Sequence, residues 1–253
     1  MEYRINRVER TGSTNADVLA AALRGEPEGL VVVAQTQTAG QGRQGRTWES
    51  PQGGGLWFTV LLRPHDVAVA RLGWLPLLAG VALAEAVRAT AKVEAGLKWP
   101  NDLLVGGAKC AGILAEATGT GGVAVGIGLN TNLAGERLPP TPTGVKATSL
   151  RLHAGSAVDN DEILGAVLDR LAVRYAEWRT HSGDADASGL RSAYTENCVT
   201  IGRRVRAILP GGAEISGRAT TVDIDGRLVV GGQAVAAGDV VHLRPIARVD
   251  EAD

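Results

Sequence analysis

The chain has 253 residues, of which 45% are hydrophobic and 4% aromatic, so it can bury one large core or two unequal ones. Its 26 basic and 27 acidic side chains are mixed along the sequence and give a net charge of −1. This balance excludes a protein drawn to nucleic acid or anionic lipid by its overall field. Any anion-binding site must therefore be local.

Cysteine usage and hydropathy indicate the compartment. Cys110 and Cys198 lie far apart and form no C-x-x-C pair, which excludes a disulfide framework and structural zinc. Residues 1–15 hold no apolar segment of signal-peptide length, and no later window reaches the ~20 apolar residues of a membrane span. The sequence predicts a soluble cytoplasmic protein that contacts no membrane.

The first predicted elements are a helix and two strands. Residues 13–25 predict a helix, with Ser13 or Thr14 as its cap. Apolar, β-branched runs at residues 29–37 and 53–64 predict two buried strands. A loop rich in glycine and arginine joins them.

Further elements follow in the middle of the chain. Residues 75–91 predict a mostly buried helix, with a proline near its start. Three short strands separated by glycine turns follow, which indicates antiparallel neighbours in one sheet: residues 96–105, 110–117 and 122–132. The clearest amphipathic helix covers residues 160–178, and a shorter one covers residues 190–197.

The pattern changes after Cys198. Short alternating strands are separated there by PGG, DGR, GG and AGD turns, which is typical of a small β-barrel. The predicted fold is therefore α+β. A mixed β-sheet with flanking helices would occupy residues 1–198, and the barrel would occupy residues 199–253.

The loop TAGQGRQGRTWES carries Gly40, Gly42 and Gly45 at the spacing of the dinucleotide fingerprint. That fingerprint needs a helix directly after its last glycine and an acidic residue about 20 positions on, whereas here the chain returns to a strand. The loop instead predicts a backbone that folds round an anion, with Arg43 and Arg46 as planar donors. A mobile surface loop with solvated arginines is the alternative.

The stretch KWPND places Lys98, Asn101 and Asp102 in one turn. A cation, an amide and a carboxylate there could hold a polyphosphate and its magnesium ion; the alternative is an Asx-turn with a solvated lysine. Lys109 opens the next strand, where it either guards a sheet edge or lies over a reacting carboxyl group. Cys110 beside it is expected to be a small buried residue and not a nucleophile.

Glycines also recur in the last strand of this region. Gly122, Gly126 and Gly128 are expected on one face of it, where missing side chains let a flat ligand lie against the backbone. Asn130 at its end could reach a ribose or a phosphate.

Taken together, the segments TGSTN, QTAGQGRQGRTW, KWPNDLL, KCAGILAE and GIGLN occur in the order and spacing seen in biotin protein ligases, and KATSL and GDVVHL agree further on. The chain resembles this family over nearly its whole length. The resemblance implies the mixed sheet and helices of the biotin and lipoate ligase fold, with an SH3-like barrel as the tail. Because TGSTN begins at residue 11, we expect the short form, biotin–[acetyl-CoA-carboxylase] ligase, without an N-terminal DNA-binding domain and without DNA binding.

The resemblance also implies roles for individual residues, in overlapping groups. The biotin-binding group would be Ser13, Thr14, Asn15, Gln37, Gly40, Gln41, Gly42, Arg43, Lys109 and Gly112. The ATP-binding group would be Arg43, Arg46, Trp48, Lys98, Asn101, Asp102 and Asn130, with Asp102 also on the metal. The catalytic cations would be Arg43, Lys98 and Lys109. The family loop usually reads G-R-G-R-x-G-R, and Gln41 replaces its first arginine, which removes one possible phosphate contact.

The activity that the resemblance implies has two steps. ATP, biotin and Mg²⁺ would give biotinyl-5′-AMP, and a lysine of a biotin carboxyl carrier domain of acetyl-CoA carboxylase or a related enzyme would then take the biotin. The nucleophile of the first step is already a carboxylate, so positioning and cations must lower the barrier. A homodimer is possible. The alternatives are a lipoate or octanoate ligase or transferase of the same fold, and a non-catalytic adapter that binds nucleic acid.

Overall fold

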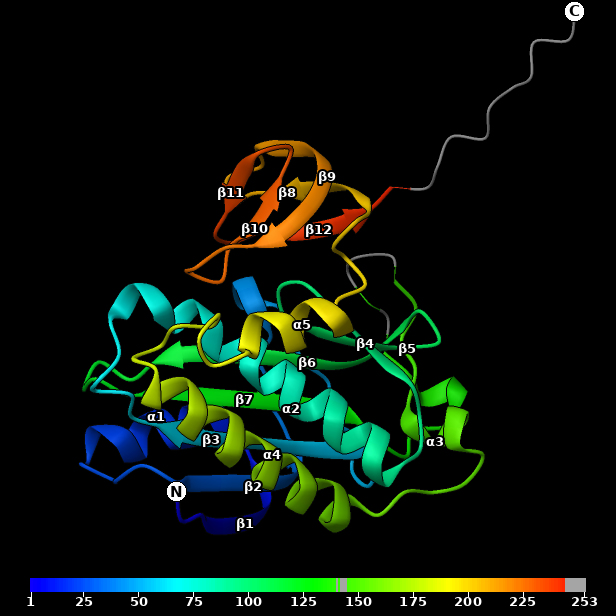
Figure 1. Cartoon of the computed structure of the whole chain (residues 1–253). Helices are drawn as coiled ribbons and strands as arrows, with labels where there is room; N and C mark the ends of the chain where they lie inside the picture. The colour runs from blue at the N-terminus through cyan, green and yellow to red at the C-terminus, as the bar shows by residue number, and fades with distance from the viewer. Residues whose placement is uncertain (140, 142–144, 244–253) are drawn as a thin grey trace, which may run out of the picture.

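The computed structural model describes residues 1–139, 141 and 145–243, and it contains two β-sheets (Figure 1). The larger sheet has the strand order β1-β2-β3-β7-β6-β5-β4, in which β1 and β2 are parallel and the other neighbours antiparallel. Its strands are β1 (Arg4–Thr11), β2 (Leu30–Gln37), β3 (Gly55–Leu62), β4 (Ala95–Lys98), β5 (Asp102–Val105), β6 (Ala108–Ala117) and β7 (Val123–Asn130). The predicted mixed sheet is confirmed.

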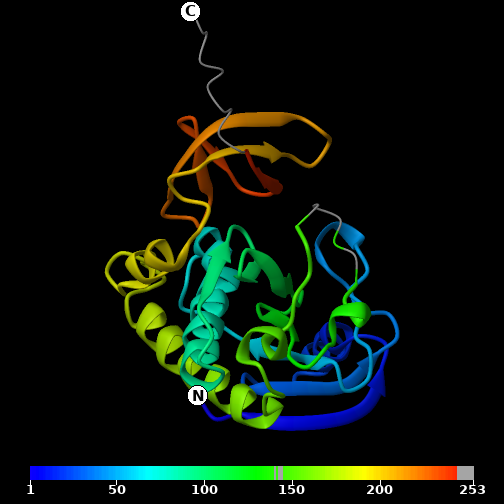
Figure 2. The same ribbon diagram turned by 90° about the vertical axis from the view of Figure 1, so that its right-hand side faces the viewer.

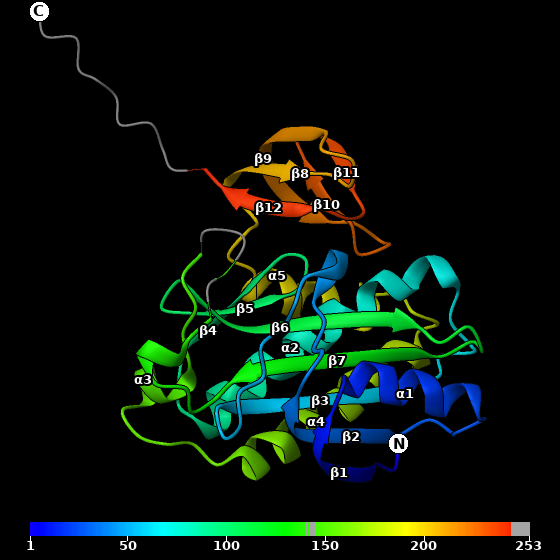
Figure 3. The ribbon, with the colours of Figure 1, turned by 180° about the vertical axis from the view of Figure 1, so that it is seen from behind.

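Helices cover both faces of this sheet. They are α1 (Thr14–Leu23), α2 (Leu75–Thr90), α3 (Leu150–Ala154), α4 (Asn160–Thr180) and α5 (Leu190–Asn197), with short 3₁₀ helices η1 (Arg43–Gly45), η2 (Val69–Trp74) and η3 (Gly135–Arg137). In β2, Val31 and Val33 join the core under α2 and α4, whereas Val32 faces α1. Side chains of a strand alternate between its faces, so one apolar run serves both layers. Figure 3 shows α1 on the face opposite to α2 and α4.

The predicted single strand at residues 96–105 is instead the hairpin of β4 and β5, and the three 3₁₀ helices were not predicted. Strand β1 and helix α3 were also missed. Strand β1 is a charged edge strand, RINRVERT, whose residues are mostly exposed and which is held by parallel pairing with β2. Helix α3 is a five-residue helix that ends at Gly155, whose φ of 78° lies in the left-handed region. Neither carries the apolar periodicity from which the other elements were predicted.

One helical segment passes the length and composition test for a membrane span. In the part of the chain that the structure describes, it is Val69–Thr90, made of η2 and α2, and 61% of its most apolar window is buried inside the fold. The expectation that no segment approaches the length and hydropathy of a membrane span is therefore wrong. Buried between α4 and the large sheet, α2 is the core helix of this layer.

The second sheet contains five antiparallel strands in the order β11-β10-β9-β8-β12. They are β8 (Arg204–Ile208), β9 (Glu214–Val222), β10 (Leu228–Val230), β11 (Gln233–Val235) and β12 (Asp239–His242). The order matches the expected barrel-like tail, although no pairing between β11 and β12 closes it among the described residues. The predicted tail after residue 243 lies outside the described residues.

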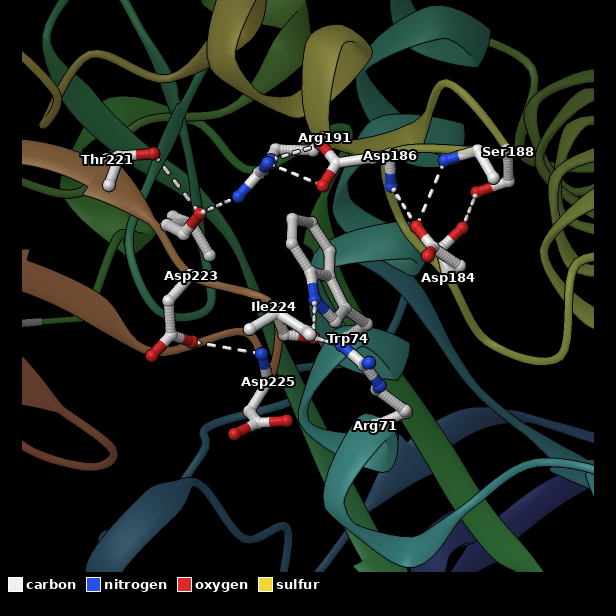
Figure 4. A network of polar contacts seen from close by, with 12 residues as sticks. Arg71, Trp74, Asp184, Asp186, Ser188, Arg191, Thr221, Asp223, Ile224 and Asp225 are labelled. Carbon is white, nitrogen blue, oxygen red and sulfur yellow. Dashed lines mark hydrogen bonds and ion pairs between the residues drawn. The ribbon is translucent and has the colours of Figure 1, made fainter.

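The second sheet is fixed to the large sheet at the β9–β10 turn (Figures 2 and 4). Arg71 Nη1 and Trp74 Nε1 both donate to the carbonyl oxygen of Ile224, at 2.6 and 3.1 Å. Trp99 Nε1 donates to the carbonyl oxygen of Gly226 at 3.1 Å. Since Trp99 belongs to the KWPND turn, the second sheet is attached directly to the predicted site.

Candidate active site

A cleft with an empty volume of about 1190 Å³, counted out to the solvent at its mouth, lies on the α1 face of the large sheet. It is bounded by the glycine-arginine loop, residues 38–50, by the KWPND turn between β4 and β5, and by β12. Every residue predicted from the sequence to be in the site lines this cleft, apart from Gly40. A Cβ at Gly40 would lie 2.4 Å from Trp48 O, so this glycine shapes the loop instead.

One end of the cleft is neutral and closely hydrogen bonded. Thr14 N donates to Gln37 Oε1 at 2.9 Å, and Gln37 Nε2 donates to Ser50 Oγ at 2.8 Å. Thr14 Oγ1 lies 2.8 Å from Thr59 Oγ1, and Thr59 Oγ1 donates to Asn15 Oδ1 at 2.6 Å. These side chains are therefore held in single orientations before any ligand binds.

The predicted helix cap is only half right. Ser13 occupies the N-cap position of α1 but its side chain makes no capping hydrogen bond. The side chain lines the cleft instead, and the free Thr14 N–H at the first helical position donates to Gln37 Oε1. The Ser13 side chain at the start of α1 thus faces the cleft and does not cap the helix.

The strand glycines make room for protein side chains. A Cβ at Gly128 would lie 2.5 Å from the indole of Trp48, and one at Gly126 would lie 1.9 Å from Asn15 Oδ1. Trp48 and Asn15 thus cover part of this backbone, although Gly126 and Gly128 still line the cleft. Gly122 lies one residue before β7 and outside the cleft, where a Cβ would lie 3.0 Å from Leu62 O.

The glycine-arginine loop is folded on itself and against β12. Gly42 N donates to Arg46 O at 2.7 Å, and the loop turns through η1. Arg43 Nη1 donates to Asn101 Oδ1 at 3.2 Å and to Gly238 O at 3.3 Å. Arg46 forms an ion pair with Asp239, with Nη1 to Oδ1 at 3.0 Å. The alternative of solvated arginines is therefore wrong.

Burial and charge change the protonation of this loop and its partner. Burial lowers the pKa of Arg43 below its usual range, against the opposing effect of Asp239 and Asp102. The hydrogen bond from Arg46 lowers the pKa of Asp239, which therefore stays an anion. Asp239 is a residue that the sequence analysis did not identify.

The other end of the cleft is a cationic corner formed by Lys98, Asp102 and Lys109. Lys98 is only 4% exposed, and burial lowers its pKa while Asp102 opposes that effect. Lys109 Nζ lies 2.6 Å from Asp102 Oδ1 and 5.6 Å from the centre of the Trp48 ring. The alternatives in which Lys98 is solvated or Lys109 only guards a sheet edge are therefore wrong. Two carboxylates, Asp102 and Asp239, face four cations here, so the corner favours an anion.

Two polar atoms of the cleft are buried without a hydrogen-bond partner among the described residues, Trp48 Nε1 and Asn130 Oδ1. Such atoms are rare in folded proteins and commonly mark a ligand, an ion or water. Asp102 Oδ1, by contrast, is paired with Lys109 Nζ at 2.6 Å. Within the described residues, no group of three or more His, Cys, Asp or Glu side chains could hold a metal alone. Asn130 Oδ1 and the Asp102 carboxylate therefore fit a magnesium ion only if phosphate oxygens complete its shell.

Cys110 takes no part in this chemistry. It is fully buried, and burial raises its pKa to about 12. The prediction of a small buried residue is confirmed, since a thiol at that pKa carries almost no thiolate at neutral pH.

Comparisons with known proteins agree with this geometry. The Biotin/lipoate A/B protein ligase family matches residues 8–132, and the Biotin protein ligase C terminal domain matches residues 200–243. The chain is 43% identical to the biotin–[acetyl-CoA-carboxylase] ligase of Mycobacterium tuberculosis, over 94% of this chain and 88% of that protein. It is 36% identical to the ligase of that name from Paracoccus denitrificans, over 89% and 93%.

A solved structure shares the whole architecture. It is the biotin protein ligase from Aquifex aeolicus in complex with biotin and ATP, with a TM-score of 0.78, 27% sequence identity, and coverage of 96% of this chain and 99% of that one. The 43% identity to a relative that is covered over 88% of its length, together with the two family matches, shows that the chain belongs to the biotin protein ligase family.

Proposed function

We propose that this protein is an ATP-dependent biotin protein ligase that forms biotinyl-5′-AMP and transfers biotin to a lysine of a biotin carboxyl carrier domain. The observation that carries the proposal is that one cleft joins the neutral, hydrogen-bonding end to the cationic corner. A ureido head group needs the former, and a carboxylate that meets a triphosphate needs the latter. The relatives named above are ligases of this activity.

The neutral end would hold the biotin ring. Ser13, Thr14, Asn15 and Gln37 line it with hydroxyl and amide groups, and the glycine-arginine loop would close over the bound vitamin. Three of these side chains are already fixed by hydrogen bonds to one another or to Thr59, so little rotamer entropy remains to be lost on binding.

The cationic corner would hold the reacting groups. Arg43, Lys98 and Lys109 all line the cleft, and they would surround the point where the biotin carboxylate meets the α-phosphate of ATP. A carboxylate oxygen attacks the α-phosphorus, its bond to the bridging oxygen breaks, and pyrophosphate leaves with the electron pair. No proton moves in this step, so no general base is required. The cations reduce the repulsion between two anions and stabilise charge on the transferring group.

Magnesium would enter with the nucleotide. Asp102 and Asn130 offer it oxygen atoms, and the ion would neutralise phosphate charge when it is bound. Arg46 and Trp48 would complete the nucleotide side, with Arg46 held by Asp239 of the second sheet.

The second step needs a protein acceptor. The neutral amine of a carrier lysine attacks the acyl carbon, an amide bond forms, AMP leaves with the electrons of the anhydride bond, and the nitrogen releases one proton to water. We expect a carrier domain of acetyl-CoA carboxylase or a related enzyme as the partner, no DNA or membrane partner, a cytoplasmic location and a homodimer. The second sheet beyond residue 198 would act as a separate domain that supports the site.

Two assays on the purified chain test this function. Exchange of labelled pyrophosphate into ATP should depend on biotin and should not be supported by lipoate or octanoate. Labelled biotin should then pass to a carrier domain and not to the same domain with its acceptor lysine replaced by arginine. Exchange that lipoate supports better than biotin would establish the lipoate alternative, and no exchange with any acid would contradict ligase activity.

A further inference from the structure

The linker between the two sheets, residues 198–200, lies along the edge of the candidate site. Strand β4 is the last strand of the large sheet, and the linker covers its outer edge through a parallel bridge of Leu97 with Cys198. Val199 N donates to Leu97 O at 2.8 Å. The linker thus holds the strand that ends at Lys98.

Thr200, at the end of this linker, joins the KWPND turn to β12. Its side chain is fully buried, and its Oγ1 accepts a hydrogen bond from Trp99 N at 3.2 Å. The other partner of this oxygen is His242 Nε2 of β12, at 3.1 Å. The His242 ring is neutral at neutral pH because burial lowers its pKa to about 4. Burial also penalises an unused hydroxyl proton, so Thr200 donates to His242 Nε2 while it accepts from Trp99.

The same two segments form the two sides of a gap that Arg43 bridges. Arg43 Nη1 donates to Asn101 Oδ1 of the KWPND turn at 3.2 Å, and to Gly238 O, just before β12, at 3.3 Å. One guanidinium nitrogen reaches both oxygen atoms only if the turn and β12 keep a fixed separation. Thr200 contacts both sides of that gap with a single oxygen atom.

The other contacts of the turn do not set this separation alone. Lys98 pairs with Asp102 of β5, but both belong to one hairpin, so the pairing leaves the distance from the hairpin to the second sheet open. Trp99 Nε1 binds Gly226 O of the β9–β10 turn, and one attachment leaves the second sheet free to rotate about it. Thr200 adds an attachment on β12, the strand that borders the cleft.

We propose that Thr200 is a positioning residue that fixes the separation between the KWPND turn and β12, and so holds Arg43 in place for adenylate formation. The inference rests on the proposed function, in which Arg43 stabilises negative charge on the transferring group. Thr200 is fully buried and does not line the cleft, so it would act on the rate without touching a substrate.

Two substitutions separate the hydroxyl group of Thr200 from its volume. Thr200→Val removes the hydroxyl at nearly constant volume, whereas Thr200→Ser keeps it. A misplacement of about 1 Å can cost about 10²-fold in rate, so we expect Thr200→Val to lower the rate of adenylate formation about tenfold. Thr200→Ser should stay within about twofold of the wild type. Single-turnover measurements at saturating biotin and ATP, well below the unfolding temperature of each variant, give these rates.

A matched control separates positioning from a loss of stability. Thr118 is also a buried threonine, and its Oγ1 accepts from Gly122 N at 3.0 Å, away from the cleft. Thr118→Val and Thr200→Val should both lower the midpoint of thermal unfolding, but only Thr200→Val should slow adenylate formation. The Kd for biotin, which would bind at the neutral end, should stay within about twofold of the wild type in both variants.

A double-mutant cycle tests whether Thr200 acts through Arg43. If Thr200 serves to hold Arg43, its hydroxyl has little left to position once the guanidinium is removed. In the Arg43→Ala protein, Thr200→Val should therefore lower the rate of adenylate formation by less than about twofold. A structural role unrelated to Arg43 would give the same tenfold loss in both backgrounds.

The half-buried partner of Thr200 provides a second pair of variants. His242→Leu removes the acceptor of the Thr200 proton, whereas His242→Gln keeps an acceptor oxygen. We expect His242→Leu to slow adenylate formation about fivefold and His242→Gln to stay within about twofold of the wild type.

The outcomes are distinct. Wild-type protein without biotin-dependent pyrophosphate exchange would overturn both the proposed function and this inference. In an active wild type, the positioning role alone is overturned if Thr200→Val is as fast as the wild type, if Thr200→Ser is as slow as Thr200→Val, or if the loss is undiminished in Arg43→Ala. If Thr200→Val does not fold, the His242 pair decides the matter: equal rates in His242→Leu and His242→Gln would also overturn the positioning role.

Discussion

The two ends of the cleft are built in different ways. The neutral end around Thr14, Asn15 and Gln37 comes mainly from the large sheet and α1. It is fixed by short hydrogen bonds between uncharged groups, and the Glu116 carboxylate holds the Asn15 amide from behind. The cationic corner contains Arg43 and Lys98, and the second sheet contributes to it from more than 190 positions away, as in the bond from Arg43 to Gly238. Under the proposed function, recognition and reaction would thus depend on different parts of the fold.

This difference predicts how each end fails. At the neutral end a lost hydrogen bond changes which ligand fits, and its effect is on affinity. At the cationic corner a lost charge changes the stabilisation of a transition state, and its effect is on rate. Four predictions can break or sharpen this division.

The largest effect is expected for the cations. Lys109→Met and Arg43→Ala should each lower the rate of biotinyl-adenylate formation by ~10²-fold or more, because each removes a charge placed where negative charge meets negative charge. Single-turnover formation of the adenylate measures this. Thermal unfolding should change little, since Lys98 still lies beside Asp102. Lys92 is an exposed lysine after α2, and Lys92→Ala is the control. An unchanged rate of adenylate formation in both Lys109→Met and Arg43→Ala would remove the catalytic assignments.

The second effect concerns the link between the corner and the second sheet. His242 Nε2 lies 3.1 Å from Thr200 Oγ1, which accepts from Trp99 N at 3.2 Å. Burial, with smaller effects of Lys98 and Arg203, lowers the pKa of His242 to about 4 from 6.5. Between these values the unfolded chain binds a proton that the folded chain does not, so stability falls as pH falls through this window.

The size of that loss can be measured directly. From pH 6.5 to pH 5 the free energy of unfolding should fall by about 1 kcal/mol from this group alone, since the slope of 1.36 kcal/mol per unit is reached only below pH 6.5 and solvent screens a half-buried group. Urea unfolding of His242→Gln should show a flatter dependence over the same range. His181→Gln, on the exposed end of α4, should keep the wild-type slope. Equal slopes in wild type and His242→Gln would show that this histidine does not carry the effect.

The third effect separates two glycines of the same loop. A Cβ at Gly40 would lie 2.4 Å from Trp48 O, whereas the nearest atom to one at Gly42 is Arg46 O at 3.6 Å. Gly40→Ala should therefore lower thermal stability and speed biotin release. Gly42→Leu should raise the biotin off-rate about tenfold, about 1.4 kcal/mol, without lower thermal stability, because the loop can no longer close. Stopped-flow measurement of biotin release gives each off-rate. An unchanged off-rate in Gly42→Leu would count against loop closure.

Much of this was predictable from local sequence. The apolar runs gave β2, β3 and β7, and the amphipathic spacing gave α4, because both signals come from burial of one stretch on one surface. The loop and the KWPND turn were identifiable as a site because, together, they match the motifs of biotin protein ligases in order and spacing; by residue chemistry alone each also fitted a solvated turn. Strand β1 was not predicted because backbone pairing with β2, and not a pattern of alternating apolar residues, stabilises it.

The partners of the site residues were not predictable. Asp239 binds Arg46 across 193 positions, and Glu116 binds Asn15 across 101. Nothing in the local pattern of either carboxylate distinguishes it from an exposed one. The burial of Lys98 was equally hidden, since it depends on how the second sheet packs over the KWPND turn.

The smallest effect tests whether the second sheet serves only one end of the cleft. Asp239→Asn keeps the shape of the side chain and removes the charge that holds Arg46. The ion pair between Asp239 and Arg46 is half-buried, and it is expected to contribute about 1 kcal/mol. The KM for ATP should therefore rise about fivefold while the Kd for biotin stays within about twofold. Glu214→Gln, which breaks the exposed pair with Arg206 at 3.6 Å on the same sheet, should leave both constants unchanged. If Asp239→Asn weakened biotin and ATP equally, the two ends would be one cooperative unit, and the neutral end would depend on β12 through the loop that both share.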